Sequence, residues 1–281
     1  MKNIIYIGFI SLFLLSSCDK IEMPYIETLP GVVVTVTFPP LDRSSVYRKI
    51  LVEEYTGHTC TNCPDGHDKI SELSMIFGDT LVPIGIHATS FANPISGLYK
   101  YDFRVKEGLE LAKDFEIYAI PVAVINRTKF GGNELGLLME QWQNAIQNVS
   151  RTIYAGIQIK DSVMGGTLLN VYTKTTMLEE YNSPLRLSVF LVEDNIIKPQ
   201  RNGTQDIEDY SHNHVLRASF NGTYGVTLTS DGILTKDSAY IKGYGLDFKE
   251  KDWKMKDCSI VVILHDPVTK EVLQVEVLKQ K

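Results

Sequence analysis

Two cysteines separated by two residues, Cys60 and Cys63, are the residues whose type and spacing most directly suggest chemistry. Thiols at this spacing can form and break a disulfide, and Pro64 directly after them fits the first turn of a helix. A helix start stabilises a thiolate, because its unpaired N–H groups and its dipole favour negative charge and lower the thiol pKa. We therefore predict that Cys60 is the nucleophile and that Cys63, one turn further, resolves the mixed disulfide that Cys60 forms.

The segments around the pair predict the elements that position it. An apolar run over 50–55 predicts a strand, residues 56–59 are typical of a turn, and apolar side chains at helical spacing predict a helix ending at Phe77, before Gly78. A Cys-x-x-Cys pair also suits zinc half-sites and inert disulfides. The order strand, loop, cysteines, helix is nevertheless the order that redox chemistry requires.

Strands and helices continue to alternate up to about residue 150. Strands are predicted over 81–87 and 121–126, and helices over 104–115 and 133–149. We therefore predict an α/β domain over 45–150, with a central mixed sheet flanked by helices.

Over 151–281 the helical period disappears and apolar residues alternate with polar ones. The alternating runs cover 155–160, 168–173, 185–192, 238–243, 259–265 and 272–278. Turn signals such as Asn202-Gly203, Asn221-Gly222 and Asp231-Gly232 separate several of them. This pattern predicts a second domain, an antiparallel β-sandwich of the immunoglobulin or fibronectin kind.

Two acidic residues in the first predicted strand are candidates for proton transfer. Glu54, six residues before Cys60, is predicted to accept the proton of the Cys63 thiol. Glu53 points to the opposite face of the strand and competes for this role, and the alternative for either carboxylate is simple solvation.

Metal binding is the rival chemistry for the same segment. His58, Cys60, Cys63 and His67 are four plausible ligands within ten residues. Against a metal, a cysteine pair in the first turn of a helix already defines a redox site, and His58 is as readily an exposed loop residue.

Other candidate residues carry weaker signals. His212 and His214, two positions apart, would share one face of a strand and could bind metal, although such residues are commonly structural. Cys258 is interpreted as a reduced thiol at the start of a core strand, and His87 and His265 end predicted strands without a recognisable partner.

The N-terminus predicts export and lipid anchoring. Lys2 and the apolar run over 4–15 are typical of a signal peptide, and residues 15–18 resemble the bacterial lipobox. Cleavage after residue 17 makes Cys18 the new N-terminus, carrying acyl chains such as palmitate that bind the protein to a membrane. Residues 18–44 are predicted to be a tether, with a possible added strand over 31–38.

The composition and net charge of the chain limit the classes of partner that it can bind. The chain has 28 Lys and Arg against 34 Asp and Glu, a net charge of −6, so nucleic acid is not an expected partner. A length of 281 residues with 44% hydrophobic residues is sufficient for two domains with buried cores.

The first predicted domain resembles thioredoxin in its acidic strand, its cysteine pair and the later Ile120-Pro121 before an apolar strand. The resemblance implies a cis proline, Pro121, facing the cysteines, and an Ile120 backbone beside the disulfide that can pair with a substrate strand. The chain lacks a tryptophan before Cys60 and has Thr61-Asn62 between the cysteines, so the direction of electron transfer stays open. The long cysteine-to-proline distance indicates an insertion around 89–114.

The whole chain resembles the outer-membrane-protein-28-related lipoproteins of Bacteroidetes. The resemblance is carried by the lipobox and by residues 53–64, 119–123 and 212–217. It implies a thioredoxin-like domain followed by a β-rich domain, and attachment to the outer membrane at a face that stays open.

Two functions follow from these predictions. The first is a cell-envelope thiol–disulfide oxidoreductase that acts on protein thiols or disulfides through Cys60, Cys63, Glu54 and Pro121 and needs no cofactor. The second is a surface binding or adhesion lipoprotein that contacts an envelope or host protein and uses the thioredoxin-like fold, with a structural disulfide, as a scaffold.

Overall fold

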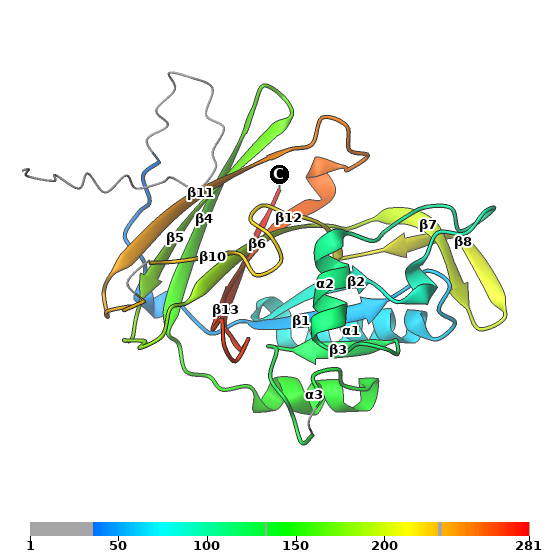
Figure 1. Ribbon diagram of the computed structural model, residues 1–281, viewed down its shortest axis with the longest axis horizontal. Coiled ribbons are helices and arrows are strands. Elements are labelled where there is room, and N and C mark those ends of the chain that lie inside the picture. The colour runs from blue at the N-terminus through cyan, green and yellow to red at the C-terminus, as the bar shows by residue number, and fades with distance from the viewer. Residues whose placement is uncertain (1–35, 133, 230–231, 281) are drawn as a thin grey trace, which may run out of the picture.

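The computed structural model describes residues 36–132, 134–229 and 232–280, and its elements fall into two groups along the chain (Figure 1). The first group contains β1 (Ile50–Thr56), α1 (Cys63–Phe77), β2 (Leu81–His87), α2 (Lys106–Asp114), β3 (Val122–Ile125) and α3 (Met139–Asn148). The second contains β4 (Ala155–Met164), β5 (Leu168–Met177), β6 (Arg186–Glu193), β7 (Ile196–Asn202), β8 (Gln205–His212), β9 (Val215–Ser219), β10 (Val226–Thr227), β11 (Ala239–Asp247), β12 (Cys258–His265) and β13 (Val272–Lys279).

A large mixed sheet joins the two groups. Its order is β13-β12-β6-β9-β2-β1-β3, with β10 paired to β6. Strands β1 and β2 are parallel, β3 is antiparallel to β1, and β9 meets β2 through the pairing of Gly85 with Val215. Strands β1, β2 and β3 of the first group therefore share one sheet with β6, β9, β12 and β13 of the second group.

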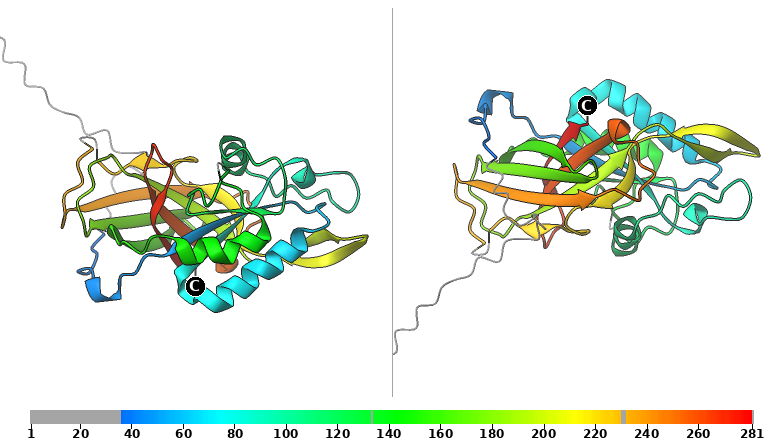
Figure 2. Two further views of the ribbon diagram at one scale, coloured as in Figure 1. Left: turned by 90° about the horizontal axis from the view of Figure 1, so that it is seen from below. Right: turned by 90° about the horizontal axis from the view of Figure 1, so that it is seen from above.

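Alternation along β1 explains how helices cover both faces of this sheet. Ile50 and Val52 pack with residues of α1 and α3, whereas Leu51 and Tyr55 pack with residues of α2. Figure 2 shows α1 and α3 on one side of these strands and α2 on the other. The predicted α/β organisation of the first half is confirmed as a mixed sheet with helices.

The second half forms two layers. A three-stranded antiparallel sheet, β11-β5-β4, packs against one face of β6 and β12 through a core that includes Leu169, Val171, Val189, Leu191 and Val262. Antiparallel strands beyond residue 150 are thus confirmed. The division into two domains at that residue stays a prediction, because the large sheet takes strands from both sides of it.

Four elements differ from their predictions. The helix predicted over 133–149 begins only at Met139, because Leu137 exchanges backbone hydrogen bonds with Ala123 instead. The strands β8 and β9 were not predicted, and β8 lacks an apolar alternation because most of its residues are exposed or half-buried. Of the possible strand over 31–38, only 36–38 lies within the described residues, and these three form no strand.

The predicted signal peptide and Cys18 lie outside the described residues. Within the described part of the chain, no helix combines the length and the apolar character that crossing a membrane requires.

Candidate functional site

Cys60 and Cys63 are joined by a disulfide, with their Cα atoms 5.4 Å apart. The helix α1 begins at Cys63, and Cys60 lies in the turn before it, where its N–H donates to the Gly57 carbonyl at 3.0 Å. The prediction that Cys60 itself opens the helix is therefore wrong by three residues, although Pro64 does lie in the first turn. Both sulfurs still lie close to the positive end of the helix dipole.

The disulfide is buried. Cys60 is 4% exposed and Cys63 is fully buried, although Thr61 and Asn62 between them are exposed. A nucleophilic sulfur reacts only when a substrate can reach it, and in the oxidised pair Cys60 is almost completely covered. A substrate must therefore approach through the segments that cover Cys60.

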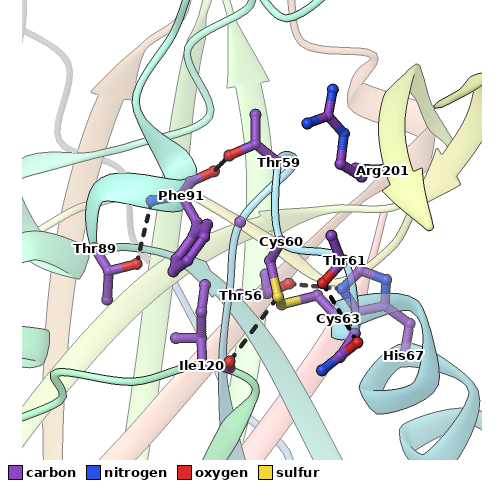
Figure 3. Close-up of a disulfide and its surroundings, with 12 residues drawn as sticks. Thr56, Thr59, Cys60, Thr61, Cys63, His67, Thr89, Phe91, Ile120 and Arg201 are labelled. Carbon is purple, nitrogen blue, oxygen red and sulfur yellow. Dashed lines mark hydrogen bonds between the residues drawn. A yellow bond between two sulfur atoms is a disulfide. The ribbon is translucent and has the colours of Figure 1, made fainter. Parts of the chain in front are cut away.

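One covering segment is the loop that follows β2. The Phe91 carbonyl accepts hydrogen bonds from the N–H of Thr59 at 3.1 Å and from its hydroxyl at 2.8 Å. Gly57 permits this approach, since a Cβ there would lie 2.6 Å from the backbone of Phe91. Figure 3 shows Phe91 and Ile120 flanking the disulfide.

The segment before β3 approaches the disulfide as the thioredoxin resemblance implies. The peptide bond between Ile120 and Pro121 is cis, and the Ile120 carbonyl oxygen lies 4.0 Å from Sγ of Cys60 (Figure 3). Pro121 packs against the first turns of α1, because a Cβ added to Gly66 would lie 3.1 Å from its side chain. The predicted placement of Ile120 and Pro121 beside the cysteines is thus observed.

The hairpin formed by β7 and β8 covers the cysteine loop from another side. Backbone N–H groups of Arg201 and Gly203 donate to the carbonyls of His58 and Thr61, each at 2.9 Å. The Gln200 side chain donates to the Cys60 carbonyl at 3.0 Å. Sequence reasoning found only the Asn202-Gly203 turn of this hairpin, because nothing local to residues 196–212 indicates a contact with residues 57–61.

Glu53 and Glu54 point to opposite faces of β1, as predicted, but neither is solvated. Glu53 is fully buried and accepts two hydrogen bonds from the Arg127 guanidinium, at 2.6 and 3.0 Å. Because Arg127 is also fully buried, each charge of this pair depends on the other. Glu53 therefore forms a structural ion pair, and Glu54 is the carboxyl of the two that is available for proton transfer.

Replacing Arg127 by Met is expected to destabilise the protein by about 3–5 kcal/mol, because it leaves the Glu53 carboxylate buried without a partner. Urea unfolding measures this loss. The matched control is Arg43→Met, which breaks the exposed pair with Asp237 and should cost at most about 1 kcal/mol. A second change, Glu53→Gln in the Arg127→Met background, should recover part of the loss. Equal stabilities of the Arg127 and Arg43 variants would contradict this account.

Glu54 lies beneath α1, next to the segment that carries Pro121. Burial raises its pKa to about 8, and its Oε1 atom has no hydrogen-bond partner within the described structure. The absence of a side chain at Gly66 makes room for this carboxyl, since a Cβ there would lie 2.6 Å from Oε1. A buried carboxyl that titrates near neutral pH can take up and release a proton during thiol chemistry.

The four residues of the rival metal site are not arranged as ligands. Cys60 and Cys63 are bonded to each other, and no group of three or more His, Cys, Asp or Glu residues in the described ranges is placed to hold a metal ion. His58 is buried, contrary to the loop prediction. Its ring stacks on Tyr99 and its Nε2 lies 3.2 Å from the Asn93 carbonyl. His67 lies instead beside β1 and the hairpin.

His212 and His214 do not share a strand face, so that prediction is wrong. The strand β8 ends at His212, whose ring packs on Phe103, and His214 follows with a positive φ of 56° and an ion pair to Asp194. His87 is buried and stacks on Phe103. His265, whose partner the sequence did not reveal, lies 3.3 Å from the Ser188 hydroxyl.

Cys258 is a free, buried thiol at the first position of β12, as predicted. Burial raises its pKa to about 12, so it is not a nucleophile at neutral pH.

Comparison with known proteins finds one matching sequence family and several similar solved structures. Its sequence matches the family described as "Outer membrane protein Omp28" over residues 109–281, a stretch that begins within α2, after the cysteine pair. The solved structure of HBP35 of Porphyromonas gingivalis is similar to the chain, with a TM-score of 0.65 and 16% identity over 84% of this chain and 76% of that one. A domain of the outer membrane lipoprotein Omp28 from Porphyromonas gingivalis gives a TM-score of 0.32 and 22% identity, over 46% of this chain and 89% of that one. Among curated proteins, no sequence matches the chain.

Proposed function

Because this chain belongs to the Omp28 family of outer membrane proteins, it resides in the cell envelope at the outer membrane, where we propose that it exchanges thiols and disulfides with other proteins through Cys60 and Cys63. The family is the one predicted from residues 53–64, 119–123 and 212–217. The family match does not include the cysteines, so support for the reaction comes from the geometry around them.

The observation that carries the proposal is the position of the Ile120 carbonyl, 4.0 Å from Sγ of Cys60 and directly before a cis proline. In a thioredoxin-like site this backbone pairs with the extended segment of a substrate, and the proline beside the cysteines excludes metal ligation. A buried carboxyl, Glu54, lies on the same face of β1 as α1 and Pro121. An inert disulfide requires neither feature.

A thioredoxin-like first half and an immunoglobulin-like second half are part of the proposal. The order of β1, the cysteine pair and α1, with the Ile120 carbonyl beside Cys60, supports the first assignment. The packing of β11-β5-β4 on β6 and β12 supports a sandwich, in which the second layer continues into the large sheet. Acylation of Cys18, with membrane attachment through that lipid, completes the proposed organisation.

The exchange needs no group beyond the two cysteines and the substrate. A substrate thiolate attacks Sγ of Cys60, the Cys60–Cys63 bond breaks, and Cys63 leaves as a thiolate that takes up a proton. A second substrate thiolate attacks the substrate sulfur of the mixed disulfide and releases Cys60. The substrate dithiol is then oxidised and the pair is reduced. In the reverse direction the Cys60 thiolate attacks a substrate disulfide, Glu54 takes the proton of Cys63, and Cys63 resolves the intermediate.

Equilibration of the full chain with dithiothreitol at graded potentials tests this function. We expect a reduction potential above about −300 mV and rapid alkylation of Cys60 after mild reduction, because structural disulfides lie below that value. Cys258→Ser is the matched control, since it removes the buried free thiol and should leave both measurements unchanged. A potential well below this value, together with an unreactive Cys60, would overturn the proposal.

Burial of the disulfide favours a second candidate function. With Cys60 at 4% exposure beneath the hairpin β7–β8, the pair can serve as a clamp in a surface protein that binds an envelope or host protein. Binding of such a partner would survive the double change Cys60→Ser, Cys63→Ser in folded protein. Loss of binding in that variant would count against this candidate.

A further inference from the structure

Among the described residues, the basic group within ion-pair distance of Glu54 is the imidazole of His67 on α1. Its Oε1 atom lies 3.9 Å from Nε2 of His67, about one ångström longer than a hydrogen bond, and this oxygen has no other partner in the described structure. His67 is therefore placed to exchange a proton with Glu54.

Two hydrogen bonds fix the orientation of the His67 ring. Nε2 lies 2.9 Å from the Thr56 hydroxyl on β1, and Nδ1 lies 2.7 Å from the Tyr210 hydroxyl on β8 (Figure 3 shows Thr56 and His67). Because both nitrogens have partners, one acts as a donor and the other as an acceptor when the ring is neutral. Burial lowers the pKa of His67 to about 4, which keeps the ring neutral at neutral pH.

Exposure increases along this series of side chains. The Glu54 side chain is 6% exposed and that of His67 is 20% exposed, and Tyr210 is half-buried on the hairpin. The groups that face His67 are Glu54 and Thr56 of β1 and Tyr210 and His212 of β8, with His214 contributing repulsion from further away. Besides burial, the carboxylate of Asp68, the next residue of α1, helps to raise the pKa of the Tyr210 hydroxyl.

We propose that His67 and Tyr210 form the path by which Glu54 exchanges its proton with solvent during the resolving step at Cys63, an inference that rests on the proposed function. The Cys63 S–H bond breaks and a Glu54 O–H bond forms. Glu54 then gives this proton to Nε2 of His67, while Nδ1–H passes its proton to the Tyr210 oxygen and the Tyr210 hydroxyl proton goes to water. No electron leaves the thiol–disulfide couple. His67 is thus a positioning and relay residue, one turn beyond Cys63.

An aromatic disulfide whose released thiolate absorbs visible light separates the two chemical steps. Cys60 of the reduced full chain releases one thiolate when it attacks the probe, and Cys63 releases the second when it resolves the adduct. His67→Gln is expected to slow the second release roughly 10-fold and to leave the first unchanged, because proton transfer contributes to the resolving step alone. Tyr210→Phe, which keeps the ring packing, should slow the second release in the same direction.

The pH profile distinguishes a relay from a structural role. In the wild type, the second release should rise with pH towards a plateau above about pH 8, where Glu54 is ionised, and His67→Gln should slow this release most below pH 8, where Glu54 must first lose its proton through His67. Cys258→Ser is the control, since this buried thiol at the start of β12 lies outside this series of side chains. Added imidazole should restore part of the rate in His67→Ala, where the space of the ring is open.

Each outcome decides one of the two proposals. A wild type that releases no second thiolate would overturn the proposed function itself. If the wild type shows both releases and neither His67→Gln nor Tyr210→Phe changes the second, the relay is wrong and the exchange function stands. Equal slowing of both releases would also overturn the relay, since it would indicate general disturbance of the site.

Discussion

A Cys63→Ser variant is expected to accumulate a long-lived disulfide between Cys60 and its substrate. In the wild type, Cys63 attacks this intermediate from the first position of α1, three residues after Cys60, and such an intramolecular thiol has an effective concentration far above that of thiols in solution. Loss of Cys63 should lengthen the lifetime of the adduct by roughly 100-fold or more. The only other thiol of the described chain, Cys258, is buried at the start of β12 and cannot substitute for it.

Mass spectrometry and non-reducing electrophoresis after exposure to a peptide disulfide measure this adduct. Cys60→Ser should form none, and Cys258→Ser should behave as the wild type. If Cys63→Ser forms no adduct while its fold is intact, Cys60 is not a nucleophile and the clamp interpretation of the disulfide gains support. The same trapped adduct, formed in envelope extracts, would identify the substrate proteins.

A Glu54→Gln variant is expected to lack the decrease in stability that Glu54 causes between pH 6.5 and 8, so the difference in stability between wild type and variant should change with pH over this range. Burial raises the pKa of Glu54 from 4.5 to about 8, so the folded state keeps its proton where the unfolded state has lost it. The stabilising contribution is full below pH 4.5 and is lost as the pH rises towards 8, by about 5 kcal/mol in total. Relative to the variant, the wild type should lose roughly 1.6 kcal/mol of stability between pH 6.5 and 8, with a slope that decreases from about 1.4 kcal/mol per pH unit as the pH approaches the folded pKa.

The buried histidines change the stability with pH in the opposite direction to Glu54, over a lower pH range that overlaps with that of Glu54 near pH 6.5. Burial lowers the pKa of His67 to about 4 and that of His212 to about 3, so their stabilising contribution is present above pH 6.5 and is lost as the pH falls. Urea unfolding of the wild type and of Glu54→Gln at pH 6.5, 7.25 and 8 isolates Glu54, because the histidine contributions cancel in the difference between the two proteins. A difference in stability that stays constant over this range would show that the carboxyl has an ordinary pKa and is accessible to water.

The parts of the site that could be predicted are those determined by local sequence. The order of strand, cysteines and helix, and the proline before an apolar strand, fall within short windows whose patterns are strong. The partner of Glu53 could not be predicted, because Arg127 is 74 residues away and carries no motif. Nor could the contact of His67 with Tyr210, which spans 143 residues and depends on the hairpin β7–β8 reaching α1.

The burial of the cysteine pair escaped prediction for the same reason. Thr61 and Asn62 are polar and exposed, as the sequence suggests, and the sulfurs are covered by Phe91 and by the hairpin, which come from distant positions. The two-layer organisation of the second half followed from its alternating runs. Its junction with the first half did not, because β9 is short and meets β2 at one pair of residues.

That junction determines where the chain can be divided. A cut at residue 150 would remove β6, β9, β12 and β13 from a sheet that also contains β1, and would expose the core in which Leu51 and Val82 meet Phe190, Val261 and Val275. Neither fragment would keep a complete interior. We therefore expect the two halves to depend on each other for folding, and exchange of either half between relatives to require new complementary residues along the whole shared core.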